Sequence, residues 1–315
     1  MKIFLNILWV VGLLVWSCCF AMGFNYGHGD SLLVSVILLF AILAIMGIDV
    51  FFLNKWTNPG SGYNRKNAKT KEIACLVTYA IMVLLTINGF AHFVAVQTEV
   101  KSEVRPKALN RIQELRRVFG DDNKGGSYQS YVVELAATYR NAMKKDYADE
   151  GTVNLAVSEF EDEMMGEGAY ERLKNQSQKF LSDCEQSIQF WIPWTVTEYL
   201  TQLDKNTEDW KVELIRLSEK NEWVKATGES YDPHIDSTVN LANQVTNPSV
   251  SDYSFLAIII IIILQIIVLF PYLRGKDWSQ SGPQKYSGKD GGPVVYGRSR
   301  KSSATANQNN TPEEV

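Results

Sequence analysis

Apolar residues in this chain are gathered into four long blocks separated by polar segments. The blocks cover residues 3–22, 31–52, 73–96 and 255–273. A helix needs about 20 mostly apolar residues to cross roughly 30 Å of hydrocarbon, and each block is close to that length. Their only acidic residue is Asp49, and they hold no Lys or Arg. The pattern predicts four transmembrane helices.

Between the third and fourth blocks the apolar residues recur at helical spacing. They mark one face of helices over residues 128–143, 153–164, 170–188 and 196–224, with Pro106 starting an earlier helix. Glycine-containing stretches, such as "DDNKGGS" and "MGEG", interrupt the pattern. We therefore expect five or six helices packed as a bundle of about 130 residues, a size that can hold one small core. The predicted fold class is all-α.

Small residues in the blocks indicate where membrane helices can approach each other. Gly12, Gly47 and Gly89 are the glycines of this kind in the first three blocks. The fourth block has no small residue after Ala257, which favours a lipid-facing anchor.

Lys and Arg indicate the orientation, since they favour the cytoplasmic side in short loops. The loop at 54–71 holds five of them, whereas the loop between the first two blocks holds none. More follow the fourth block, beginning with Arg274 and Lys276. The chain is expected in a plasma membrane or a bacterial inner membrane. Both termini are expected on the cytoplasmic side. The segment 98–252 is expected outside.

Four parts follow from this topology. They are three transmembrane helices in 1–97, an extracytoplasmic helical domain in 98–252, a fourth transmembrane helix in 253–273 and a disordered tail in 274–315. The third helix can continue outward as a stalk through Val100 and Val104, whereas the return is a short polar linker with Ser251 or Asp252 as helix cap. Alternatively, 1–21 is a secretory signal cleaved after Ala21.

Charge narrows the class of partner. Residues 98–252 contain 28 Asp and Glu against 18 Lys and Arg, a net charge of about −10. An acidic surface disfavours nucleic acid and anionic lipid. We expect membrane lipid around the apolar helices, and protein partners or self-association through the outer domain.

The cysteines argue against a disulfide framework, because Cys18, Cys19 and Cys75 lie in membrane blocks and leave Cys184 alone outside. Cys184 lies on an apolar stripe, which favours a buried thiol over a bridge between two copies. In plan, four spans with a large loop before the last resemble the tetraspanins. That family carries Cys-Cys-Gly and paired cysteines in this loop, which the chain lacks, so no functional residue is carried over.

Polar residues inside the apolar blocks are candidates for a solute pathway. Asn88 and His92 are four residues apart on the third block, Gln265 is central in the fourth, and Asp49 is near the cytoplasmic end of the second. The structural alternative is that Asn88 and Gln265 hydrogen-bond neighbouring helices, and that Asp49 reaches water or Lys55.

Metal and catalytic signals are weak. In "YDPHID", the residues Asp232, His234 and Asp236 would share one side of an extended segment and could hold a divalent ion; Asp236 could equally cap a helix. No nucleophile motif or phosphate loop is present. The sequence predicts no enzyme, no cofactor and no firm metal site.

One aromatic stretch, "FWIPW", interrupts the outer domain. Pro193 can start the second of two helices, so Phe190, Trp191 and Trp194 are expected to fill the core at a helix junction. The alternative is an exposed patch that binds a partner or rests on the outer leaflet. The whole pattern favours a noncatalytic sensor, scaffold or subunit of a membrane complex; the second interpretation is a channel or transporter subunit.

Overall fold

The computed structural model describes residues 2–28, 32–57, 65–120, 126–146, 149–248 and 255–276. All its helices belong to the unit Met1–Gly275. The described residues are predominantly helical, with no strand among them, as the sequence predicts. The linker with Ser251 and Asp252, part of the 54–71 loop and the tail from residue 277 lie outside the described residues, and so do the predictions made for them.

Within the described residues, four helices are long and apolar enough to cross a membrane. They are α1 (Lys2–His28), α2 (Leu32–Thr57), α3 (Arg65–Ala95) and α11 (Phe255–Gly275). This confirms the four predicted transmembrane helices and marks the chain as a multi-pass membrane protein. Each is longer than its apolar block, because backbone hydrogen bonding continues past the point where the side chains become polar.

The other three membrane helices, α2, α3 and α11, all contact α1. Trp16 of α1 is fully buried, stacks on Phe90 of α3 at a ring distance of 4.6 Å, and donates a 3.0 Å hydrogen bond from Nε1 to the Thr86 hydroxyl. The Trp16 indole therefore packs its ring against apolar side chains while its N–H group is hydrogen-bonded.

Two glycines permit the closest approach of α1 and α3. A Cβ atom built on Gly23 would lie 1.8 Å from the carbonyl oxygen of Gly89, so no other residue fits at Gly23 without separating the helices. Gly89 confirms the sequence expectation, and Gly12 does so against Val268 of α11, at 3.0 Å. Gly47 has no neighbour within 4 Å.

The expectation that α11 is a lipid-facing anchor holds for one side of the helix and not for the other. Its long, branched side chains leave one side exposed, but Ala257, Ile261, Val268 and Tyr272 are buried against the other membrane helices. Small residues are not needed on α11 itself, because Gly12 of α1 provides the space.

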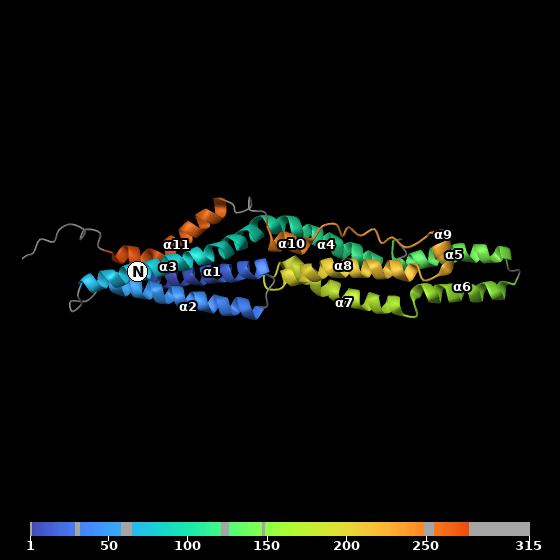
Figure 1. Cartoon of the computed structure of the whole chain (residues 1–315), viewed down its shortest axis with the longest axis horizontal. Coiled ribbons are helices and arrows are strands. Elements are labelled where there is room, and N and C mark those ends of the chain that lie inside the picture. The colour runs from blue at the N-terminus through green and yellow to red at the C-terminus, as the bar shows by residue number, and fades with distance from the viewer. Residues whose placement is uncertain are drawn as a thin grey trace, which may run out of the picture. The chain divides into compact units, whose positions relative to one another are not determined.

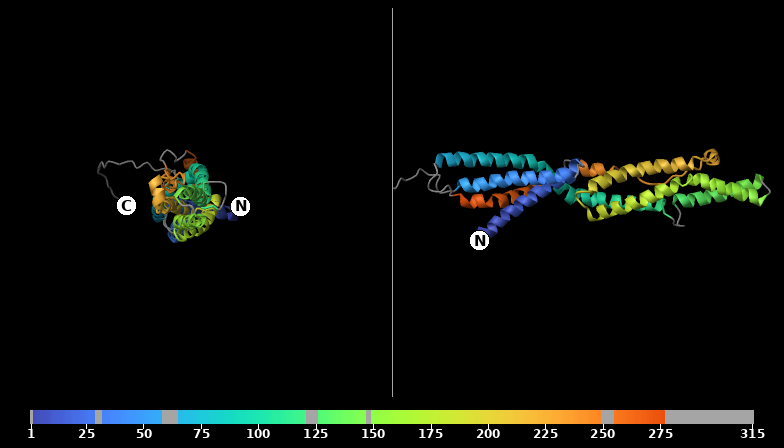
Figure 2. Two further views of the ribbon diagram at one scale, coloured as in Figure 1. Left: turned by 90° about the vertical axis from the view of Figure 1, so that its right-hand side faces the viewer. Right: turned by 90° about the horizontal axis from the view of Figure 1, so that it is seen from below.

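The remaining helices form a domain between α3 and α11. They are α4 (Lys101–Val118), α5 (Tyr128–Asp146), α6 (Glu150–Met165), α7 (Ala169–Phe190), α8 (Val196–Ser218), α9 (Glu222–Thr227) and α10 (Leu241–Thr246). We call residues 101–248 the helical domain. Figure 1 shows α7 beside α8, and α5 with α6 as a hairpin at the end farthest from the membrane helices. In the right-hand view of Figure 2 the α5–α6 hairpin again lies at the end farthest from the membrane helices.

Pro106 does not start a helix, contrary to expectation, but lies inside α4. A proline inside a helix costs about 3 kcal/mol. Val104, Ala108, Ile112 and Leu115 form a fully buried stripe along α4, and their burial, at roughly 1.5–3 kcal/mol for each large aliphatic side chain, outweighs that cost.

After α9 the chain returns toward the membrane helices as an irregular segment, residues 229–240, ending in α10. The buried Arg111 of α4 holds it by donating a 2.8 Å hydrogen bond to the Val239 carbonyl and by pairing with Asp204 of α8. Asp204 also accepts from the Ala242 amide at 2.9 Å. One ion pair thus ties α4, α8 and the start of α10 together.

Candidate functional site at the membrane-proximal junction

The helical domain is joined to the membrane helices by an unbroken helical path. α3 passes through η1 (Val96–Val100), a single π-helical turn, directly into α4 (Figure 1). The Lys101 amide bonds back to the Val96 carbonyl, five residues earlier. π-turns inserted in α-helices are frequent at functional sites, and this one lies where the apolar segment ends. The predicted stalk is therefore present, with a local change of helical winding at its base.

His92 forms a second connection. The sequence marked it as a candidate for a polar pathway, but its Nε2 lies 2.9 Å from the Val245 carbonyl of α10, 153 residues away. A carbonyl can only accept, so Nε2–H is the donor. Both residues are buried. His92 therefore attaches the last helix of the domain to the third membrane helix.

Asn25 of α1 forms a third connection. Its Nδ2 donates to the Pro193 carbonyl at 3.0 Å, and its Oδ1 accepts from the Ser35 hydroxyl of α2 at 3.3 Å. Asn25 is almost fully buried. The amide thus uses both its donor and its acceptor to bind two membrane helices to the turn between α7 and α8.

Tyr26 places the end of α1 inside the core of the helical domain. Its side chain is fully buried, and its hydroxyl accepts from Gln97 Nε2 at 2.9 Å. Trp191 lies close to the same hydroxyl. Tyr26, Val96 and Trp191 belong to one apolar cluster with Val245, so the domain's core continues to the membrane helices.

The aromatic stretch divides into three environments. Trp191 is 2% exposed and fills the core, Phe190 is 69% exposed, and Trp194 is half-buried. Trp191 takes a left-handed conformation with φ 50° at the end of α7, a position where glycine is usual. Burial of the indole compensates for that backbone cost of about 1–2 kcal/mol. Pro193 lies in the turn, and α8 begins later, at Val196.

The other intramembrane candidates do not gather at one place. Gln265 of α11 accepts a 2.5 Å hydrogen bond from the Tyr79 hydroxyl of α3. Asp49 of α2 is buried near Tyr79, and its Oδ2 has no hydrogen-bond partner within the described residues. Asn88 is exposed on α3, whereas His92 faces inward. Asp49 and Gln265 thus each interact with Tyr79, from which His92 is 13 residues distant along α3.

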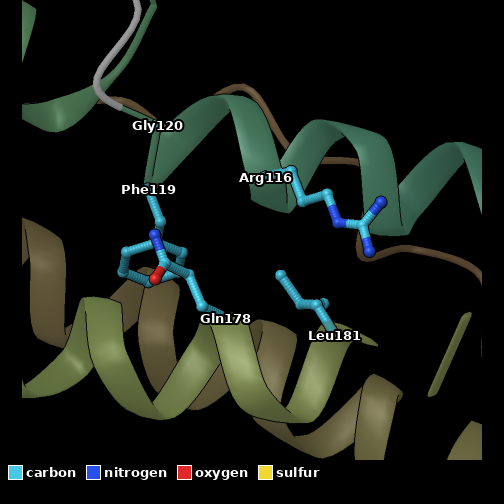
Figure 3. Close-up of a pocket in the computed structure, with 5 residues that line it drawn as sticks. All are labelled: Arg116, Phe119, Gly120, Gln178 and Leu181. Atoms are coloured by element: carbon cyan, nitrogen blue, oxygen red, sulfur yellow. The ribbon is translucent and has the colours of Figure 1, made fainter. Parts of the chain in front are cut away.

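A cavity of about 370 Å³ opens on the helical domain, between α4 and α7. Figure 3 shows Arg116 of α4, and Phe119 just after the end of that helix, above Gln178 and Leu181 of α7. The Arg116 guanidinium is also paired with Glu185 of α7 at 2.6 Å. The lining combines a cation, an amide and apolar carbon, which suits a small amphipathic molecule or a partner side chain.

The residues considered for a metal site, Asp232, His234 and Asp236, form hydrogen bonds within their own segment. His234 Nδ1 lies 3.0 Å from an Asp232 carboxylate oxygen, whereas Asp236 accepts from the Thr238 amide and hydroxyl. These hydrogen bonds hold the pKa of Asp236 below its usual range. The described residues contain no group of three possible metal ligands. Asp236 does not cap α10 either, because Asn240 does, accepting from the Asn243 amide at 2.7 Å.

Cys184 is fully buried, as its position on the apolar stripe of α7 predicts. Burial raises the pKa of its thiol to about 12. The side chain is part of the core rather than a reactive group or a surface for a bridge.

Sequence reasoning missed Asn25, Tyr26, Gly23 and the Arg111–Asp204 pair. The only signal in the sequence was positional, since Asn25 and Tyr26 are polar residues just beyond the first apolar block.

Comparison of the chain with family models, with curated proteins and with solved structures finds no match.

Proposed function

We propose that this chain is a noncatalytic membrane protein, a sensor or scaffold in a membrane complex, whose helical domain binds a partner outside the cytoplasm. The observation that carries the proposal is the unbroken α3–η1–α4 helix. A partner or ligand that moves α4 against α7 must also move α3 or bend the helix at η1, because a helix is stiff along its axis.

Two further contacts support this coupling. His92 and Asn25 bind α10 and the α7–α8 turn to α3 and α1. The His92 hydrogen bond is buried and the Asn25 hydrogen bond is partly buried, and both link residues more than 150 positions apart. Displacement of the domain therefore acts on two membrane helices at once, and the cavity beside Arg116 lies on α4 itself.

The orientation in this proposal rests on charge. The Lys and Arg of the 54–71 loop and of the segment after α11 favour the cytoplasm, which puts the helical domain outside a plasma membrane or bacterial inner membrane. Reporter fusions at residue 60 and at residue 125 test it. Opposite compartments are expected, and the same compartment for both would contradict the topology.

Partner binding is tested on the full chain in its native membrane. A photoreactive amino acid at Phe190, 69% exposed beside the junction, should give one discrete cross-linked product. The same group at Leu155, 63% exposed on α6, is the matched control. The same cross-linked products from both sites would argue against a partner-binding domain. So would the absence of any cross-linked product from both sites and from a third site beside Arg116.

A solute pathway is the second candidate, favoured by the buried Asp49 carboxylate, which has an unpartnered oxygen and interacts electrostatically with Tyr79, the residue that bonds to Gln265. Ion flux into proteoliposomes that disappears with Asp49→Asn and with Gln265→Leu would support it. Absence of flux in the parent chain across several cations and protons would leave the binding function as the proposal.

A further inference from the structure

One face of α3 points away from the other membrane helices and carries a regular pattern. Ala74, Val77, Ile81, Leu84 and Asn88 are all exposed, and they follow each other at intervals of three, four, three and four residues. The three large apolar members are at least half exposed. This alternation is the heptad spacing that brings two helices together along a left-handed seam. We call these five residues the α3 stripe.

Asn88 distinguishes the α3 stripe from an ordinary lipid-facing surface. Its amide makes no hydrogen bond to any other described residue. It lies within the apolar block 73–96, one helical turn before His92, which bonds to the helical domain. Lipid tails offer neither donor nor acceptor, and an unsatisfied amide in hydrocarbon is costly. Gln265, by contrast, is bonded to Tyr79.

We propose that the α3 stripe is covered by the α3 stripe of a second copy of this chain, with the two Asn88 amides bonded to each other. Copies inserted in one membrane share one orientation, so two α3 helices related by a twofold axis along the membrane normal run parallel. Equivalent residues then meet at the same depth. An amide carries both a donor and an acceptor, so the complementary partner of Asn88 is another Asn88.

The apolar members of the α3 stripe favour contact along the length of the two α3 helices over contact at one crossing point. Val77, Ile81 and Leu84 continue the seam for two further turns toward the start of α3. A polar Asn at one position of such a seam fixes register and favours a defined pair. This inference does not depend on the proposed function, since it concerns the face of α3 opposite the bundle.

Energy transfer between two fluorescently labelled populations of the full chain, reconstituted over a range of lipid-to-protein ratios, tests the pairing. The parent chain should pair, and Asn88→Leu should raise the apparent Kd about tenfold, the size expected from one interhelical amide contact. Asn88→Gln should restore most of the pairing, because it keeps donor and acceptor. Thr78→Val is the matched control, since the Thr78 hydroxyl is exposed but already bonds to the Ala74 carbonyl of its own helix.

Cysteine cross-linking locates the contact independently of stability. Leu84→Cys should form a disulfide-linked pair above the baseline of the parent chain, whereas Ile262→Cys, on the exposed side of α11, should not. Three results would overturn the proposal: no energy transfer at any density, pairing that is unchanged by Asn88→Leu, or cross-linking of Cys at position 84 only to a different protein.

Discussion

The imidazole of His92 and the main-chain carbonyl of Val245 are joined by a buried 2.9 Å hydrogen bond that links α3 to α10 across 153 residues. The sequence suggests His92 as a member of an intramembrane path. In the structure it is a point of attachment between the membrane helices and the helical domain.

His92→Leu should therefore destabilise the protein by about 1–3 kcal/mol, because it leaves the fully buried Val245 carbonyl without a donor. Thermal unfolding of the full chain in detergent measures the change. His28→Leu is the control, since His28 is exposed and its Nδ1 lies 3.1 Å from the Phe24 carbonyl of its own helix. Equal losses for the two variants would contradict the role given to His92.

Gly23→Ala should disrupt the packing of α1 on α3, because the new Cβ would lie 1.8 Å from the Gly89 carbonyl oxygen. Overpacking usually costs about 1–3 kcal/mol, and a collision with backbone belongs at or above the upper end of that range. Gly47→Ala is the matched change without a collision, because no atom lies within 4 Å of its Cβ position. Yield of monodisperse protein and its melting temperature should fall for Gly23→Ala alone.

Asp204→Ala should destabilise the helical domain by about 3–5 kcal/mol, since it leaves the buried Arg111 guanidinium without its carboxylate. Replacing both residues, with Arg111→Met and Asp204→Leu, should recover a large part of the loss because no charge remains buried. Glu103→Ala is the comparison, as its pair with Lys107 is exposed and should contribute less than about 1 kcal/mol. Unfolding by denaturant measures all three. A double variant no better than Asp204→Ala would contradict the explanation.

Alkaline pH should unfold the helical domain through its cluster of tyrosines. Tyr128, Tyr131 and Tyr231 have ring distances of 5.0 to 5.8 Å. Burial raises the pKa of Tyr131 and of Tyr231 from 10.0 to about 12, and that of Tyr128 further. The unfolded chain loses these protons first, so the stabilisation is complete below about pH 10 and falls as pH rises toward 12.

Circular dichroism and tyrosinate absorbance, followed together, test this pH dependence. Ionisation of these tyrosines should coincide with loss of helix. Tyr231→Phe should make the dependence on pH shallower, because one titrating group is removed. Ionisation of all tyrosines near pH 10 with helix content unchanged would show that the cluster is not buried as described.

Much of the architecture followed from the sequence alone. The four membrane helices were predictable because the cost of placing polar groups in hydrocarbon requires about 20 apolar residues in succession, and 255–273 shows this without any tertiary information. Helices α5, α6 and α7 were predictable because each has an apolar stripe at helical spacing. Cys184 was placed correctly in the core for the same reason.

Only the tertiary structure decided which of these elements meet. The pairs His92 with Val245 and Asn25 with Pro193, and the Gly23–Gly89 contact, join residues far apart in the chain. No local periodicity encodes them. Pro106 lies inside α4 because burial of the neighbouring side chains outweighs the local backbone preference. Trp191 adopts a left-handed conformation because burial of its own indole does the same. Local patterns thus determined the helices, whereas long-range packing determined the junction.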